Sequence, residues 1–303
     1  MIQHQTVLIT GGAGFIGSHI AESLVEQNDV YVLDNLSTGT EANLPDGVEV
    51  ICGDIRDQSA FESLPDVDLI FHEAALVSVP ESVDDPERSN AINVDGTLNT
   101  LEYARTADAR VVLASSTAIY GDASTIPTPE SEPITPNSPY GIDKASLDRY
   151  ARVYHELYGL ETVALRYFNV YGPRQSAGDY SGVISIFLEQ ARNGEPITVH
   201  GDGTQTRDFV SVDDVVQANL KAAKTDHVGL SYNVGTGTEV SIREVAETIR
   251  DVTDSDSEIV HTEGRDGDIE RSVADLSRTR EMLGYEPTVS FEDGIRSLVD
   301  AGE

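Results

Sequence analysis

The chain has 303 residues, 53 of them acidic and 20 basic, and its formal net charge of −33 makes nucleic acid and anionic membranes poor partners. No apolar run approaches the roughly 18 residues of a membrane span, and the N-terminus lacks the pattern of a secretory signal. Cys52 is the only cysteine, which excludes an intramolecular disulfide and predicts a reducing cytoplasm.

The acidic residues are spread along the chain between regular apolar segments. This distribution argues against an acidic tail and against a disordered region. We expect a globular protein from a halophilic, high-salt cytoplasm, where dense carboxylates keep the surface hydrated and salt screens their repulsion. The length suits one α/β domain together with a smaller one.

Residues 6–20, TVLITGGAGFIGSHI, run from β-branched and apolar residues through a glycine cluster into helical periodicity. Gly11, Gly14 and Gly17 stand at GxxGxxG spacing, which predicts a strand, a tight turn and a helix N-terminus in succession. Glycine lets a phosphate approach the backbone closely, and a helix start offers unpaired N–H groups. The stretch therefore predicts a dinucleotide site.

Residues 30–34, VYVLD, predict a second strand that finishes on Asp34, 17 residues after Gly17. This is close to the spacing of about 20 residues expected for the carboxylate that receives a ribose 2′-hydroxyl. Such a carboxylate favours NAD, because the 2′-phosphate of NADP would meet like charge. The alternative is a solvated aspartate in a turn.

The first half of the chain continues to alternate strands and helices. Pro80 and Pro86 predict a loop within it. The alternation predicts an α/β fold with a doubly wound parallel sheet of the Rossmann type, which binds ligands beyond the C-terminal ends of its strands. The remaining strands are expected at residues 48–57, 68–75 and 110–116, and the helix at residues 90–106.

The second half begins with a helix predicted at residues 140–158 and a strand at residues 161–172. We expect residues 1–172 to form the NAD-binding domain, with segments around 205–236 returning to it. Residues 173–303 are expected to form mainly a smaller C-terminal α/β substrate-binding domain. Its helices are expected at residues 183–192, 212–223, 241–252 and 275–283, and its short strands at 196–200 and 232–235.

Tyr140 and Lys144 form a YxxxK pair whose spacing of four puts both side chains on one helix face. A nearby ammonium and a cationic nicotinamide would lower the pKa of the phenol, so Tyr140 could act as a general base near neutrality. The alternative is an amphipathic helix with an incidental lysine. Ser116, at the end of the strand before this helix, could share a substrate proton, although a hydroxyl there is also a common cap.

These features resemble the extended short-chain dehydrogenase/reductases, specifically the NAD-dependent epimerase/dehydratase family and, within it, the UDP-glucose and UDP-N-acetylglucosamine 4-epimerases. The resemblance spans nearly the whole chain. It rests on the motifs TGGAGFIGSH, DNLSTG, GDIRD, HEAA, NVDGT, SSTAIYG, YGIDK, RYFNVYGPRQ, GDGTQTRDFV and GRDGDIERSVAD.

The resemblance implies a role for each matching residue. Tyr140 would remove the proton of the sugar 4-hydroxyl while C4 gives hydride to NAD, Lys144 would hold the nicotinamide ribose, and Ser116 would share the proton. The residues implied to contact NAD are Gly11, Gly14, Phe15, Ile16, Gly17, Asp34, Asn35, Asp54, Ile55, Ala74, Asn93, Tyr140, Lys144 and Phe168.

The resemblance also implies a UDP-sugar substrate, bound by Ser116, Asn169, Arg207, Arg265, Asp268 and Ser272. Arginine forks suit a diphosphate, although each arginine could equally be a salt-bridge partner. Epimerases restricted to glucose and galactose commonly carry a bulky Tyr at the position of Ser272 and a Lys at that of Val77. The smaller Ser272 predicts room for a 2-acetamido group.

Three alternatives remain open. A 4,6-dehydratase would need an Asp-Glu pair after the strand-end hydroxyl, where this chain has Thr117 and Ala118. A decarboxylase of the UDP-glucuronate type is harder to exclude, and a non-catalytic NAD-binding sensor typically lacks the Tyr or the Lys.

No histidine spacing predicts a metal site. The resemblance implies a homodimer, formed through the helices at residues 90–106 and 140–158.

Overall fold

The computed structural model describes residues 2–175, 182–264 and 269–300. Its main feature is a seven-stranded, wholly parallel sheet in the order β11-β6-β5-β4-β1-β2-β3. The reversal of strand order between β1 and β4 confirms the predicted doubly wound fold. The strands are β1 (Thr6–Thr10), β2 (Asp29–Asp34), β3 (Glu49–Cys52), β4 (Leu69–His72), β5 (Arg110–Ser116), β6 (Thr162–Tyr167) and β11 (Leu230–Val234).

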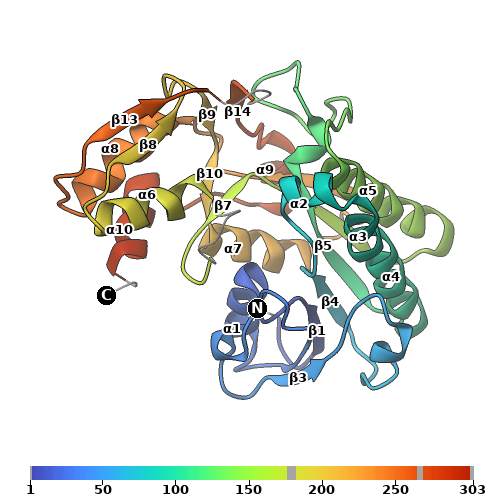
Figure 1. Cartoon of the computed structure of the whole chain (residues 1–303). Helices are drawn as coiled ribbons and strands as arrows, with labels where there is room; N and C mark the ends of the chain where they lie inside the picture. Colours follow the sequence, from blue (N-terminus) through green and yellow to red (C-terminus); the bar gives the residue numbers. More distant parts are fainter. Residues whose placement is uncertain (1, 176–181, 265–268, 301–303) are drawn as a thin grey trace.

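Helices cover both faces of this sheet (Figure 1). Alternate residues of β1 point to opposite faces, so Val7 and Ile9 pack in one core and Leu8 in the other. Helices α1 (Phe15–Leu24), α7 (Val212–Ala222) and α9 (Ser277–Leu283) supply the first core, and α4 (Gly96–Ala107) and α5 (Pro139–Tyr158) supply the second.

The prediction of a loop around Pro80 and Pro86 is wrong. Two short helices, α2 (Val79–Asp84) and α3 (Pro86–Asn90), occupy it, each with its proline in the first helical turn. Proline has no N–H to lose there, and Ser78 and Asp85 cap the two helices with their side chains. A π-helical turn over Ala91–Asp95 then leads into α4.

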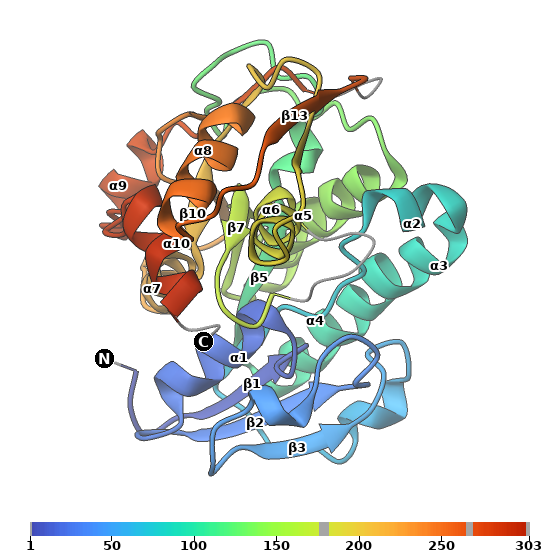
Figure 2. The ribbon, with the colours of Figure 1, turned by 60° about the vertical axis from the view of Figure 1, so that its left-hand side comes forward.

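A second lobe has its own core, built from α6 (Val183–Arg192), α8 (Ile242–Val252) and α10 (Phe291–Asp300) around the paired strands β8 (Ile197–His200) and β13 (Ile259–Thr262). This lobe lies at the left in Figure 1 and comes forward in Figure 2. The short strands of two small sheets lie between the two lobes: β7 (Asn169–Tyr171) with β10 (Phe209–Ser211), and β9 (Thr206–Arg207) with β12 (Val240–Ser241) and β14 (Arg271–Ser272).

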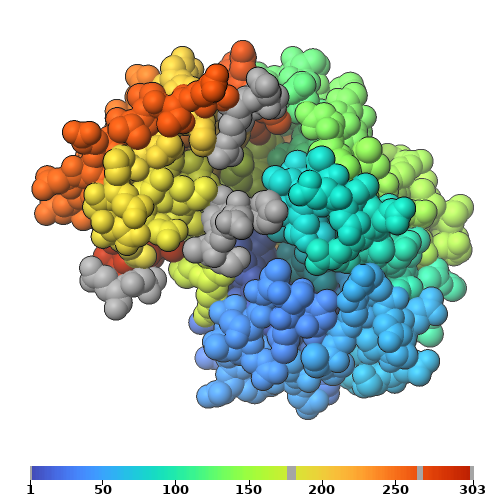
Figure 3. All heavy atoms as spheres, viewed as in Figure 1, coloured from blue at the N-terminus to red at the C-terminus, as the bar shows by residue number. Residues whose placement is uncertain are grey.

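The strand expected at residues 161–172 is therefore two strands, because the chain leaves the large sheet after Tyr167 and pairs with β10. Single-turn helices complete the fold at Glu41–Asn43, Gln58–Phe61 and Thr117–Tyr120. The surface is recessed between the second lobe and the helices α2–α4 (Figure 3). Within the described ranges, no helix is long and apolar enough to cross a membrane.

Candidate active site

The turn between β1 and α1 requires glycine at two of its three predicted positions. Gly11 has φ +69°, and a Cβ on it would lie 2.6 Å from the backbone of Ala74. A Cβ on Gly17 would lie 2.4 Å from the carbonyl oxygen of Gly11. Gly14 is the N-cap and contributes no side-chain cap, so the first N–H groups of α1 remain available to a phosphate. These observations fit the diphosphate of a dinucleotide.

Asp34 holds this turn in place. Its carboxylate accepts hydrogen bonds from the backbone N–H groups of Ala13, at 3.0 Å, and Leu36, at 2.8 Å. The side chain is nearly buried at the C-terminal end of β2. A carboxylate bound this way keeps lone pairs for a ribose hydroxyl, so its place fits the predicted role.

Asn35, Asp54 and Ile55 gather beside Asp34, at the ends of β2 and β3. The amide of Asn35 donates to Asp54 at 3.0 Å, and Arg56 donates twice to the same carboxylate, at 2.9 and 2.7 Å. The hydrogen bonds from Arg56 hold the pKa of the Asp54 carboxyl well below its usual range. Ile55 is buried against Gly96 of α4.

Asn93 lies in the π-helical turn and is almost completely buried. Its amide accepts from the N–H of Leu76 at 2.9 Å and donates to the carbonyl of the same residue at 3.0 Å. Asn93 therefore fixes the segment that follows β4, in which Ala74 packs against the glycine turn. Through these two hydrogen bonds, Asn93 positions the backbone that borders the glycine turn.

Tyr140 and Lys144 lie in the first turns of α5, which Ser138 caps by accepting from Gly141. Both side chains are buried, and the Lys144 ammonium lies 5.9 Å from the Tyr140 ring centre. The same ammonium donates to the carbonyl of Ala114 on β5 at 2.7 Å. Ser116 ends β5, so all three predicted catalytic residues meet at one edge of the sheet.

The proton equilibria of this cluster differ from the expectation for Tyr140. Burial raises the pKa of the Tyr140 phenol, and hydrogen bonding to Ser116 opposes the rise only in part. Burial also lowers the pKa of Lys144 to about 8. A depressed phenol pKa therefore requires the additional positive charge of a bound nicotinamide.

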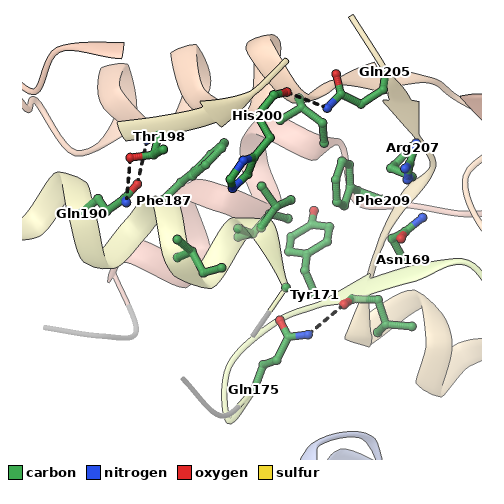
Figure 4. Close-up of a pocket in the computed structure, with 16 residues that line it drawn as sticks. Asn169, Tyr171, Gln175, Phe187, Gln190, Thr198, His200, Gln205, Arg207 and Phe209 are labelled. Carbon is green, nitrogen blue, oxygen red and sulfur yellow. Dashed lines mark hydrogen bonds between the residues drawn. The ribbon is translucent and has the colours of Figure 1, made fainter. Parts of the chain in front are cut away.

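Asn169 and Arg207 line one cavity of about 570 Å³, which the short strands β7, β9 and β10 form with α6 and β8 of the second lobe (Figure 4). Arg207 donates to the carbonyls of Thr206 and Ile269, which sets the direction of its guanidinium. Ser272 pairs with Arg207 across β14 and β9, so the proposed specificity residue lies beside the cavity. The predicted Arg265 and Asp268 lie outside the described residues.

Aromatic and polar side chains complete the cavity. Tyr171, His200 and Phe209 converge in its centre, while Phe187 and Gln190 come from α6 (Figure 4). The Tyr171 hydroxyl is buried and has no hydrogen-bond partner within the described part of the chain. A cavity with apolar walls and a few polar groups suits a nucleoside.

Phe168 lies where the chain passes from the large sheet to the strand pair of β7 and β10. It is buried between β6 and β7, and its N–H donates to the carbonyl of Val234 at 2.9 Å.

Sequence reasoning missed two neighbours of the catalytic cluster. Ser82 of α2 accepts from the N–H of Tyr140 at 3.1 Å, and Glu73 follows β4 directly. A carboxylate straight after a buried strand was the available signal for the second.

The sequence profile of the NAD dependent epimerase/dehydratase family matches residues 7–235. The UDP-glucose 4-epimerase of Mycolicibacterium smegmatis is 39% identical over 303 residues, covering 97% of each chain. UDP-glucuronic acid decarboxylase 6 of Arabidopsis thaliana is 36% identical over 301 residues, covering 95% of this chain and 86% of the relative.

Two solved structures are also similar. The UDP-N-acetylglucosamine 4-epimerase of Methanobrevibacter ruminantium, in complex with UDP-N-acetylmuramic acid, superposes with a TM-score of 0.95 at 39% identity, covering 99% of this chain and 98% of the other. The UDP-glucose 4-epimerase of Thermus thermophilus, in complex with NAD, superposes with a TM-score of 0.88 at 39% identity, covering 97% and 98%.

Proposed function

Because this chain belongs to the NAD-dependent epimerase/dehydratase family, we propose that it is a 4-epimerase of UDP-hexoses. The observation that carries the proposal is the meeting of Tyr140, Lys144 and Ser116 at the edge of the sheet whose glycine turn fits the family's dinucleotide. The acidic composition and single cysteine support a cytoplasm of high salt as its place of action.

In the proposed reaction Tyr140 removes the proton of the sugar 4-hydroxyl, and Ser116 shares that proton. Bound NAD supplies the chemistry of accepting a hydride from C4 and returning it. The ammonium of Lys144 favours the ionised phenol of Tyr140. Asn169 and Arg207 hold the nucleotide diphosphate, while the 4-keto sugar turns and presents its other face.

Two other reactions of the family compete with epimerisation. Thr117 and Ala118 cannot act as the acid and base of a 4,6-dehydratase. A UDP-glucuronate decarboxylase uses a related oxidation, so product analysis must separate the two activities.

The protein in high salt is expected to interconvert UDP-galactose and UDP-glucose without added NAD and to release no carbon dioxide from UDP-glucuronate. Carbon dioxide without epimerised product would make it a decarboxylase, and no product from any UDP-sugar would favour a sensor.

The substrate range extends to UDP-N-acetylglucosamine and UDP-N-acetylgalactosamine. Ser272 is small and pairs with Arg207, which lines the cavity, and this pairing supports the proposal that an acetamido group fits beside the sugar. A tyrosine at this position would fill that space.

Ser272→Tyr is expected to lower kcat/KM for the acetamido sugars by about 10–100-fold, because their extra group must compete with the ring for one volume. The value for UDP-glucose should stay within about threefold of the wild type. Initial rates with the four UDP-hexoses measure both effects, with Ser272→Ala as the matched control. Equal losses on both sugar classes would show that Ser272 does not set the specificity.

The protein acts as a homodimer formed through the outer face of α5. Ile142, Tyr150 and Leu157 expose apolar surface on this helix, and Val79 and Val83 extend it on α2. Apolar surface of this kind is typical of an interface between subunits. The apolar residues of α4, by contrast, pack on the large sheet.

Ile142→Glu is expected to convert the dimer to a monomer of 32.7 kDa, because a buried unpaired carboxylate opposes association. Light scattering in high salt gives the mass, and Glu81→Gln on α2 is the control for a change of charge. A wild-type protein that is already monomeric would contradict the interface.

A further inference from the structure

A carboxylic acid that the proposed reaction does not use lies between the glycine turn and the catalytic cluster. Glu73 follows the last residue of β4, and its N–H donates to the carbonyl of Thr10 at 3.0 Å. The backbone of Glu73 and Ala74 forms the wall that Gly11 touches. Because β4 stands between β1 and β5, a dinucleotide that extends from the turn toward Lys144 must pass this residue.

The side chain of Glu73 is anchored at one end only. The Tyr167 hydroxyl donates to Oε1 of Glu73 at 2.9 Å, and the Asn219 amide donates to the Tyr167 oxygen at 2.8 Å. Glu73 thus reaches from β4 across the end of β5 to β6. Its second carboxyl oxygen accepts no hydrogen bond from the described residues, and the residue is partly exposed.

The surroundings of Glu73 hold its two protonation states close in free energy near neutrality. Burial raises the pKa of its carboxyl to about 7, against the opposing effects of the Tyr167 hydrogen bond and the charge of Lys144. Those two groups, from β6 and α5, are the titratable ones that act on Glu73 among the described residues. His72 lies beside it along β4, and burial lowers its pKa to about 3, so it stays neutral.

We propose that Glu73 is the electrostatic partner of the oxidised nicotinamide: its carboxyl group releases a proton to solvent when the cationic dinucleotide binds and keeps that proton when the neutral, reduced form binds. No covalent bond forms or breaks apart from the O–H bond of the acid. An added positive charge in a site of low dielectric favours the carboxylate, and the carboxylate in turn favours the cation.

The inference rests on the family's dinucleotide and not on the choice of sugar. Its consequence is a bias of the bound cofactor toward the oxidised form, which is the form that can accept a hydride. Both forms carry the same diphosphate, so the ratio of their affinities isolates the charge of the ring.

The test is a competition in which NAD⁺ displaces fluorescent bound NADH from the protein at pH values from about 5.5 to 7.5. In the wild type the ratio of the Kd of NADH to that of NAD⁺ should rise with pH, by up to about tenfold per unit, and level off above the Glu73 pKa of about 7. The ratio rises with pH because, below the Glu73 pKa, NAD⁺ binding must displace a proton from the carboxyl group, which weakens NAD⁺ binding at low pH.

Glu73→Gln keeps an oxygen for Tyr167 and removes the titrating proton. This variant should have a ratio that is flat below pH 7 and about tenfold below the wild-type plateau. Calorimetry in two buffers at about pH 6, below the range in which Tyr140 and Lys144 titrate, should detect more proton release on NAD⁺ binding by the wild type than by Glu73→Gln, and none on NADH binding. A Glu73→Gln variant that follows the wild-type curve would overturn the proposal.

Tyr167→Phe is the matched control, because it removes the anchor and keeps the carboxyl. The lost hydrogen bond favoured the charged form, so the rise in the ratio should persist and move to higher pH. A flat ratio in Tyr167→Phe would attribute the effect to distortion of the wall and would also overturn the proposal. Neither readout uses turnover of a sugar, so failure of the epimerase proposal would be visible separately.

Discussion

Tyr140→Phe is expected to lower kcat for UDP-galactose by roughly 10³-fold, because no other described side chain at the site replaces the phenol as the general base. The substitution removes one oxygen atom and keeps the ring that fills the space between Ser116 and Lys144. The bound dinucleotide should be retained, since the glycine turn and Asp34 lie elsewhere on the sheet edge.

Initial rates in high salt measure the effect, together with the absorbance of the extracted dinucleotide. Tyr158→Phe is the matched control, because Tyr158 lies on the same helix and is exposed. It should leave kcat within about twofold of the wild type. A kcat within tenfold of the wild type in Tyr140→Phe would remove the phenol from the reaction.

Arg166→Met is expected to lower the free energy of unfolding by about 3–5 kcal/mol. Arg166 on β6 and Asp148 on α5 form a buried bidentate pair with two contacts of 2.9 Å. Ser115 and Ser231 also donate to Asp148, so one carboxylate ties α5 to three strands. The loss of Arg166 would leave the charge of the Asp148 carboxylate buried without a counterion.

Denaturant unfolding in high salt measures this loss. The double variant Arg166→Met, Asp148→Leu should recover most of the stability, because neither charge is then left unpaired. Asp148 is one helical turn beyond Lys144, so the single variant should also lower kcat. A single variant less than about 1 kcal/mol below the wild type would show that the pair contributes little to stability.

Local patterns predicted what depends on local geometry. The four-residue spacing of Tyr140 and Lys144 places them together on any helix, and the glycines at 11, 14 and 17 specify a turn whichever sheet surrounds them. The prediction of a loop at Pro80 and Pro86 was wrong because proline is common both in loops and in the first turn of a helix, and the local sequence does not distinguish the two.

Contacts between distant segments were beyond reach of local patterns. Asn169 and Arg207 reach one cavity because of the strand pairings of β7 and β9. Strands of three and two residues are too short to leave a recognisable pattern in the sequence. Glu73 is another example, since its meaning depends on Tyr167 and Lys144, which lie far from it in the chain.

The measurement that tests the account most directly follows deuterium placed at C4 of UDP-galactose, incubated with the protein in high salt without added NAD. The account predicts UDP-glucose that retains the deuterium at C4, because the hydride that leaves the carbon returns to it. UDP-glucose that has lost the deuterium to solvent would contradict transient oxidation at C4.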